Sequence, residues 1–171
     1  NARIGLSEFE TNQFLIRNKD NITLIEYAAF YGSANIFNYL VNNGVKLVPS
    51  IWLYAIHGEN EEIIQTLSKN SVVPEDITYN QCYEESIKCH HFDIFNYIQN
   101  NFPHEEQKLN FPIAALKYYN FFALKDDLDV KFYLYELCKY DHSLLLRAII
   151  KKTNFDINMI KINEFKYLIQ F

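Results

Sequence analysis

Apolar side chains recur along this chain with the spacing of amphipathic helices, and one short segment is nearly repeated. The sequence Ile-Phe-Asn-Tyr-Leu at residues 36–40 returns as Ile-Phe-Asn-Tyr-Ile at residues 94–98. Between them, residues 63–67 carry apolar side chains at the same positions. Because apolar residues three and four apart lie on one face of a helix, each segment is predicted to be a helix with one buried face.

A second helical pattern precedes each of these three segments. The three patterns cover residues 24–32, 51–58 and 82–90. Each has a small residue at the equivalent position, namely Ala28, Ala55 and Ser86. Their spacing predicts a pair of short helices that recurs about every 27 to 31 residues. One such pair has too little apolar face to be stable alone, so neighbouring pairs are expected to stack as a solenoid.

Two further pairs are predicted from weaker patterns. A fourth pair combines residues 114–121 with a short second helix at about residues 122–128. A fifth pair combines residues 132–140 with residues 142–151. Residues 163–171 are predicted to open a sixth pair that is cut off.

Polar residues mark where these helices are expected to begin and end. Ser7 and Glu10 have the spacing of a capping box, which predicts an N-terminal helix that runs to about Arg17. The second helices of the first three pairs are expected to end at Asn43 with Gly44, Asn70 and Asn101. Asparagine tolerates the left-handed backbone conformation that a helix C-terminus often needs.

The first pair resembles the ankyrin repeat, whose pattern is T-P-L-H-x-A-A-x-x-G followed by I-V-x-x-L-L-x-x-G. The residues in register with this pattern are Thr23, Ala28, Ala29, Gly32, Ile36, Leu40 and Gly44. Over about residues 21–158 the chain resembles the divergent ankyrin proteins, rich in Asn and Ile, of some single-celled eukaryotes. The resemblance implies an all-α, ankyrin-like solenoid of about five stacked helix-turn-helix units with shortened hairpin loops.

The chain departs from the ankyrin pattern at several positions. Leu24 and Glu26 stand where the pattern has Pro and His. Gly58 comes one position early, and His90 and Tyr119 stand where Gly is expected. Because the repeats are also shorter than usual, a binding mode that depends on long projecting hairpins is not expected.

Composition agrees with a helical repeat protein. Hydrophobic residues make up 49% of the chain, which has only four Gly and four Pro. This argues against a turn-rich β-sandwich and against disorder. We expect a single ankyrin-repeat domain over residues 1–171, with an N-terminal capping helix at residues 1–20, repeats over residues 21–158 and a truncated further repeat at residues 159–171.

The net charge and the cysteines limit which classes of partner and which cellular location we expect for this chain. A formal net charge of −5 argues against nucleic acid, which binds clustered Lys and Arg. The chain contains no run of about 18 apolar residues that would predict a membrane span, so no membrane partner is expected. Three cysteines cannot all pair, which favours reduced thiols in an intracellular, cytoplasmic location. The chain lacks an initial Met and stops within an apolar run, which indicates a piece of a longer protein.

The cysteines and histidines do not form a recognised metal or catalytic pattern. Cys82 and Cys89 are seven residues apart, next to His90 and His91, whereas zinc sites favour C-x2-C or paired histidines. We therefore expect no metal and no cofactor, and interpret the cysteines as small buried hydrophobes. A nucleophilic site from Cys89, His90 and Cys138 is conceivable, but adjacency in sequence places neither a base nor an oxyanion donor. The chain is not expected to be an enzyme.

The resemblance also indicates where a partner would bind. In ankyrin-type repeats, variable positions after the Ala-Ala pair line the concave surface. The corresponding residues here, called the strip below, are Phe30, Tyr31, His57, Lys88, Cys89, Lys117, Tyr118, Lys139 and Tyr140. The strip combines aromatic and cationic side chains without a carboxylate, which suits an acidic segment of a partner protein.

Two functions follow from this interpretation. The first is a non-catalytic protein–protein interaction module that binds a partner protein on its concave helical face. The alternative is a structural subunit or scaffold of a large protein assembly, held through its ends and convex side. Trp52 is interpreted as a core anchor, with an exposed binding hot spot as the alternative.

Overall fold

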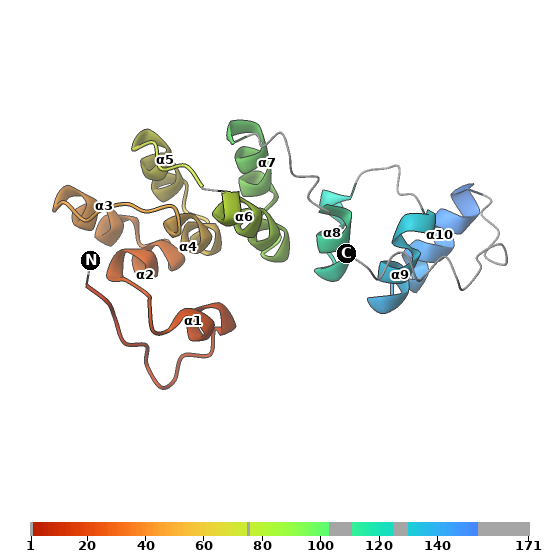
Figure 1. Cartoon of the computed structure of the whole chain (residues 1–171), viewed down its shortest axis with the longest axis horizontal. Coiled ribbons are helices and arrows are strands. Elements are labelled where there is room, and N and C mark those ends of the chain that lie inside the picture. Colours follow the sequence, from red (N-terminus) through yellow and green to blue (C-terminus); the bar gives the residue numbers. More distant parts are fainter. Residues whose placement is uncertain (1, 75, 103–110, 125–129, 154–171) are drawn as a thin grey trace. The chain divides into compact units, whose positions relative to one another are not determined.

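The computed structural model describes residues 2–74, 76–102, 111–124 and 130–153 (Figure 1). These residues form ten α-helices and a short 3-10 helix but no β-strand, so the predicted all-α class is confirmed. The chain divides into two compact units, Asn1–Gln107 (unit 1) and Lys108–Phe171 (unit 2), which are described separately. The further repeat predicted at residues 159–171 lies outside the described residues.

Unit 1 contains seven helices, six of which form the predicted pairs. The helices are α1 (Gln13–Asn18), α2 (Leu24–Phe30), α3 (Ala34–Asn42), α4 (Ile51–Gly58), α5 (Glu61–Lys69), α6 (Asp76–Lys88) and α7 (Phe92–Asn101). The first helices pack in sequence, α2 against α4 and α4 against α6, and each also packs against the second helix of its own pair. Figure 1 shows α3, α5 and α7 on one side of this row, while α1 lies on the other side of α2 and α4.

Small residues bring the first helices close together. Ala28, Ala55 and Ser86 are almost completely buried, as the repeated pattern predicts. Gly58 of α4 lies against the end of α2, where an added Cβ would come 2.8 Å from the backbone nitrogen of Gly32. The two helices could not approach this closely with a larger residue at that position.

Trp52 anchors the core of unit 1. Its side chain is fully buried, and its indole Nε1 donates a hydrogen bond to the carbonyl of Val72 at 2.8 Å. Its ring also lies 5.4 Å from that of Phe102 in an edge-to-face arrangement. The interpretation of Trp52 as a core anchor is confirmed, and the exposed hot spot is excluded.

The same turn follows the first helix of every pair, in both units. One residue of each turn takes a left-handed backbone conformation, with φ of 61° at Gly32, 45° at Glu59, 62° at His90, 56° at Tyr119 and 54° at Asp141. In four of these turns the next backbone N–H bonds a carbonyl five residues earlier: Ser33 to Ala28, His91 to Ser86, Asn120 to Ala115 and His142 to Leu137. The positions of His90 and Tyr119, where the ankyrin pattern has Gly, thus keep the conformation that favours Gly.

Asparagines end the second helices by a different mechanism from the one expected. Asn43 and Asn70 have φ of −91° and −86°, outside the left-handed region, which Gly44 and Ser71 adopt instead. The asparagine side chains donate to carbonyls one turn back: Asn43 to Tyr39, Asn70 to Thr66 and Asn101 to Tyr97. These bonds satisfy acceptors that a helix C-terminus leaves open.

The N-terminal helix starts later than predicted. Ser7 and Glu10 form a turn, and α1 begins at Gln13 with Asn12 as its N-cap. The capping box occurs instead at Thr23 and Glu26, at the start of α2. Because burial of the Glu26 carboxylate requires partners, it accepts hydrogen bonds from Thr23 and from the hydroxyl of Ser50.

Unit 2 is described over four elements: α8 (Phe111–Lys117), the 3-10 helix η1 (Phe121–Ala123), α9 (Val130–Lys139) and α10 (Ser143–Thr153). Helix α9 packs against both α8 and α10. The predicted fifth pair is confirmed. The second helix predicted at residues 122–128 is wrong over its described part, where a single 3-10 turn replaces it; residues 125–129 lie outside the described residues.

Candidate functional site

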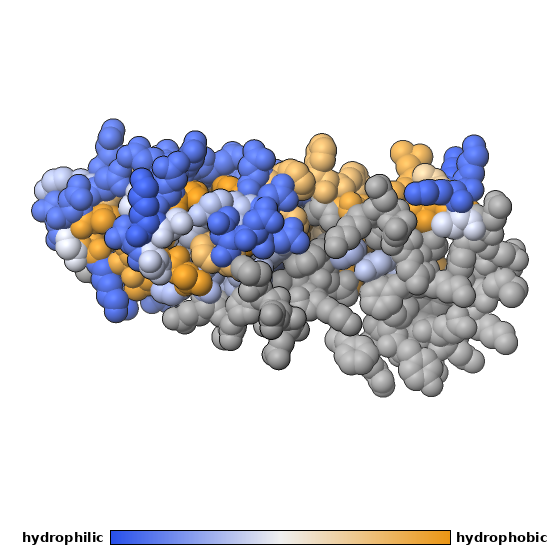
Figure 2. Space-filling view, turned by 90° about the horizontal axis from the view of Figure 1, so that it is seen from above, coloured by the Kyte–Doolittle hydropathy of each residue, from blue (hydrophilic) through white to orange (hydrophobic). Residues whose placement is uncertain are grey.

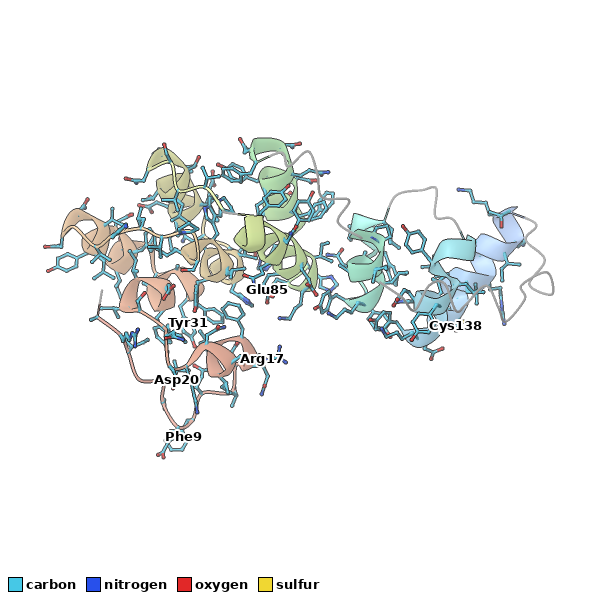
Figure 3. All side chains as sticks on the ribbon, in the orientation of Figure 1. Phe9, Arg17, Asp20, Tyr31, Glu85 and Cys138 are labelled. Carbon is cyan, nitrogen blue, oxygen red and sulfur yellow. The ribbon has the colours of Figure 1, made fainter. Side chains whose placement is uncertain are left out.

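The C-terminal ends of α4 and α6 bring together four residues, called the polar cluster below: His57, Glu85, Lys88 and Cys89. His57 lies in the last turn of α4. Glu85 lies in the last turn of α6, and Cys89 follows the last residue of that helix, four positions after Glu85. Residues four apart share a helix face, so both face α4. Figure 3 labels Glu85 at this junction.

The imidazole of His57 lies between a carboxylate and a thiol. Its Nε2 is 2.9 Å from Oε1 of Glu85, and its Nδ1 is 3.5 Å from Sγ of Cys89. The carboxylate can only accept, so Nε2 of a neutral ring carries the proton and Nδ1, the nitrogen nearer to Cys89, keeps its lone pair. Lys88 also donates to Oε1 of Glu85, at 2.6 Å. A three-residue Cys–His–carboxylate arrangement therefore exists in unit 1.

The pKa values in the polar cluster show which groups are ionised. Burial opposes ionisation of Glu85, but hydrogen bonds from His57 and Lys88 outweigh it and hold the pKa of Glu85 below its ordinary value. Burial, together with the negative charge of Glu85, raises the pKa of Cys89 to about 11. At neutral pH the cluster holds a carboxylate and a protonated thiol. Catalytic cysteines have a lowered pKa, whereas the pKa of this thiol is raised.

Aromatic rings enclose His57 on two sides. The ring centroid of Phe14 in α1 lies 4.4 Å from that of His57, and the ring of Phe30 in α2 lies 4.8 Å away. Phe14 also contacts Tyr54 of α4, edge to face at 5.1 Å. These contacts fix the orientation of the imidazole and place the N-terminal segment over the ends of α2 and α4.

In unit 1 the structure brings the predicted strip residues together. Phe30 is 8% exposed beneath Phe14, whereas the adjacent Tyr31 is 52% exposed. The other three strip residues of this unit, His57, Lys88 and Cys89, belong to the polar cluster.

Carboxylates from outside the strip pair with two of its residues. Glu10 accepts a hydrogen bond from the Tyr31 hydroxyl at 3.1 Å, and Glu85 pairs with Lys88. The positive charge of Lys88 is therefore already compensated within the chain. An acidic partner segment would have to compete with Glu85 for it.

The strip residues of unit 2 form cation–π contacts. The ammonium of Lys117 lies 4.7 Å from the ring centroid of Tyr118, and that of Lys139 lies 5.0 Å from the ring of Tyr140. The hydroxyl of Tyr119 donates to the carbonyl of Tyr140, which ties the two turns together.

The histidine next to Cys89 in space is not the one next to it in sequence. His90 takes the left-handed turn conformation, and its ring is exposed. His91 pairs with the carbonyl of Ile56 at 2.7 Å, and His142 pairs in the same way with the carbonyl of Leu116. These two side chains hold neighbouring pairs together. Cys138 is an exposed residue of unit 2.

Sequence reasoning missed Glu85 and Phe14 as site residues. Glu85 had a usable signal, because it lies four residues before Cys89 on one helix face. His57 and Cys89 occupy equivalent positions of neighbouring pairs, and such positions lie side by side in a stacked repeat. Phe14 carried no signal, since its place depends on how the N-terminal segment folds back.

The polar cluster also contains donors for a metal ion. One donor atom from each of His57, Glu85 and Cys89 lies within 4.8 Å of the other two.

Over the described residues, no helix is both long enough and apolar enough to span a membrane. Searches against family models, curated proteins and solved structures return no match for this chain.

Proposed function

We propose that this chain is a divergent ankyrin-like repeat protein whose function is to bind a partner protein, without catalysis, through the strip on the first helices. The observation that carries the proposal is the meeting of the strip residues of unit 1 at the C-terminal ends of α2, α4 and α6. Tyr31, His57 and Lys88 come from three consecutive pairs, and the helices that carry them pack in sequence.

The recurring turn supports the ankyrin-like interpretation. A residue with a left-handed backbone conformation follows each of five first helices, and an equivalent backbone hydrogen bond closes four of these turns. A polar side chain then reaches back to the preceding pair: Asn60 to the carbonyl of Gly32, His91 to Ile56 and His142 to Leu116. Similar local geometry at three junctions between neighbouring pairs is expected of a repeat whose units contact mainly their neighbours.

Tyr31 is the residue of unit 1 best suited to a partner. It is about half exposed, and its ring already packs edge to face against Tyr27 at 4.8 Å and Phe30 at 5.0 Å. An aromatic side chain that is held before binding loses little conformational entropy on binding, which is why such residues dominate interfaces. Lys88, with a side chain 36% exposed, lies at the other end of the same row.

The chemistry of the polar cluster does not favour an enzyme. Cys89, His57 and Glu85 have the residue types of a nucleophilic triad, but the raised pKa of Cys89 keeps its thiol protonated. Phe14 and Phe30 also pack against the His57 ring and restrict the approach of a substrate to it.

The second candidate is a structural subunit of a large assembly, and the outer helices favour it. Ile36 and Tyr39 of α3 are 51% and 67% exposed, and Phe92 at the start of α7 is 40% exposed. Figure 2 views unit 1 from the side of α3, α5 and α7, and shows hydrophobic side chains among hydrophilic ones on that face. Such a face would contact neighbouring subunits.

Site-specific photo-crosslinking separates the two candidates. A photoreactive phenylalanine derivative replaces Tyr31 in one variant and Tyr39, the matched exposed tyrosine of α3, in the other. The crosslinked polypeptide is identified, purified and titrated against the chain. The proposal predicts crosslinks from position 31 and at least about tenfold weaker binding by the Tyr31→Ala variant than by Tyr39→Ala. Crosslinks from position 39 with binding insensitive to Tyr31→Ala would overturn it in favour of the assembly function.

A further inference from the structure

The polar cluster has a chemical property that partner binding does not use. Its three donors differ in kind: a thiol sulfur, an imidazole nitrogen and a carboxylate oxygen. They come from two helices that the repeat holds together, so the chain does not have to fold around an ion to assemble them. We propose that His57, Glu85 and Cys89 form a binding site for a zinc ion.

The spacing of the donors suits a tetrahedral ion. Zinc bonds of about 2.3 Å to sulfur and about 2.0 Å to nitrogen place these two ligand atoms about 3.5 Å apart at a tetrahedral angle. Sγ of Cys89 lies 3.5 Å from Nδ1 and 4.0 Å from Nε2 of His57. Oε1 of Glu85 lies 2.9 Å from Nε2. One ion binds a single ring nitrogen, and Nε2 is the one close to both Glu85 and Cys89, so the side chains must move by about half an ångström or more for coordination.

The ligand types select the metal. Thiolate and imidazole favour zinc over calcium and magnesium, which prefer a shell of oxygen atoms. The pair Glu85 and Cys89, four residues apart on one helix, has the spacing by which helices commonly present two ligands to one ion. Three protein ligands leave a fourth position for water or for a donor from another molecule.

The surroundings of the site both help and oppose binding. Phe14 and Phe30 hold the His57 ring in place and lower the polarity around it, which strengthens coordination. The ammonium of Lys88 opposes it, because it pairs with Oε1 of Glu85 and repels a cation. The Lys88 side chain is partly exposed and can turn to solvent when an ion takes its place. Zinc coordination removes the thiol proton of Cys89, which passes to the solvent, and the ring proton of His57 moves from Nε2 to Nδ1 so that Nε2 can bind the ion.

Cobalt(II) is the probe, because a thiolate–cobalt bond gives a charge-transfer absorption that free cobalt lacks. The full chain, reduced and freed of metal with a chelator, is titrated with cobalt chloride and then with zinc chloride. The site predicts one equivalent of cobalt, a thiolate charge-transfer band, and loss of that band as zinc displaces the cobalt.

Matched variants assign the ligands. The Cys89→Ser variant is expected to lose the band, whereas Cys138→Ser keeps it. His57→Gln and Glu85→Gln are each expected to weaken cobalt binding by more than about tenfold, while the neighbouring His90→Gln and Glu84→Gln leave it unchanged. Lys88→Met should tighten binding severalfold, an effect that a damaged fold would not produce.

Other results would overturn the site. A wild-type chain that gives no thiolate band, or a Cys89→Ser variant that keeps the full band, would contradict coordination by Cys89. Loss of the band in Cys89→Ser but in neither His57→Gln nor Glu85→Gln would contradict the three-residue site. Circular dichroism of each variant confirms that the helices remain.

Discussion

In unit 1 the stacked helices bury large side chains completely, including Trp52, Phe37 and Ile56. In the described part of unit 2 the buried apolar side chains are Ala115, Leu116, Leu134 and Leu137, with no Trp or Phe among them, and two polar residues, Asn120 and His142, are also buried. Both units use the same turn between paired helices. The turn after the first helix is therefore common to both units, whereas the side chains that form the apolar core differ between them.

The fourth pair shows the consequence most clearly. Where the first three pairs have a second helix of nine or ten residues, the described chain after α8 makes only the three-residue turn η1. Phe121 and Phe122 of this turn are 49% and 81% exposed. Because residues 121–124 form no amphipathic helix, these aromatic side chains remain at the surface. The buried contacts in the described part of unit 2 include polar ones such as that of His142.

The largest expected effect comes from Gly58→Ala in unit 1. Alanine favours a helix over glycine by about 1 kcal/mol, but here its methyl group would overlap the backbone of Ala29 and Gly32. Because backbone cannot move aside as a side chain does, overpacking costs about 3 kcal/mol, which outweighs the gain in helix propensity and makes the substitution destabilising. We expect the free energy of unfolding of unit 1 to fall by about 2 kcal/mol. Fluorescence of Trp52, the single tryptophan, measures it during urea unfolding.

The control for this variant is Gly5→Ala, because an added Cβ at Gly5 meets no atom within 4 Å. Its unfolding midpoint should stay close to that of the wild type. Equal midpoints for Gly58→Ala and the wild type would mean that α2 and α4 do not pack as closely as described.

A smaller effect is expected from His142→Ala in unit 2. The substitution removes a buried hydrogen bond to the carbonyl of Leu116, which keeps only a longer bond of 3.3 Å from the N–H of Tyr119, and this costs about 1–2 kcal/mol. Amide hydrogen exchange should speed up in α9 and α10, including at the N–H of Leu146, which bonds the carbonyl of His142.

The matched variant is His91→Ala, which removes the equivalent bond to Ile56 in unit 1. Because the large apolar core of unit 1 is untouched, exchange in its core helices should change less. A larger effect of His91→Ala than of His142→Ala would contradict the difference between the units.

Phe14→Ala tests the cover that α1 places over the strip. It removes ring contacts with Phe30, Tyr54 and His57, and should lower the stability of unit 1 by about 1 kcal/mol. Alkylation of Cys89 by iodoacetamide should become faster, as read by mass spectrometry. Phe9, 82% exposed, offers the control Phe9→Ala. Identical effects of the two variants would mean that α1 does not cover the site.

The smallest expected effect concerns reactivity and leaves stability unchanged. Because burial and Glu85 raise the pKa of Cys89 to about 11, only a small fraction is thiolate at neutral pH. In a Cys138→Ser background, alkylation of Cys89 should accelerate about tenfold per pH unit between about pH 7 and pH 10. A rate that levels off near neutral pH would show a lowered pKa and would favour a nucleophilic thiol instead.

The helix pairs of unit 1 were predictable because their signal is local. Apolar spacing and the small residues Ala55 and Ser86 specify which face is buried, whichever partner covers it. The bounds of α4 agree with the predicted segment, residues 51–58. The helix start predicted at residues 7–10 was wrong, because a capping box stabilises a helix only where the following residues can bury a face. The chain forms a turn there instead.

The polar cluster was only partly predictable, because it depends on contacts between pairs. His57, Lys88 and Cys89 were selected as strip residues from their repeat positions. The sequence shows that Glu85 shares a helix face with Cys89, but its contact with His57 follows from the packing of α4 against α6. The location of the chain within the cell and its partner stay predictions from sequence.

The central claim is that the ends of consecutive first helices meet beneath the N-terminal segment, with His57 at the meeting point. Two-dimensional nuclear Overhauser spectroscopy of the His57 ring protons tests it most directly. The account predicts cross-peaks to the rings of both Phe14 and Phe30, with ring-current shifts of the imidazole protons and loss of the first set in Phe14→Ala. Imidazole protons with unperturbed shifts and cross-peaks to neither ring would contradict it.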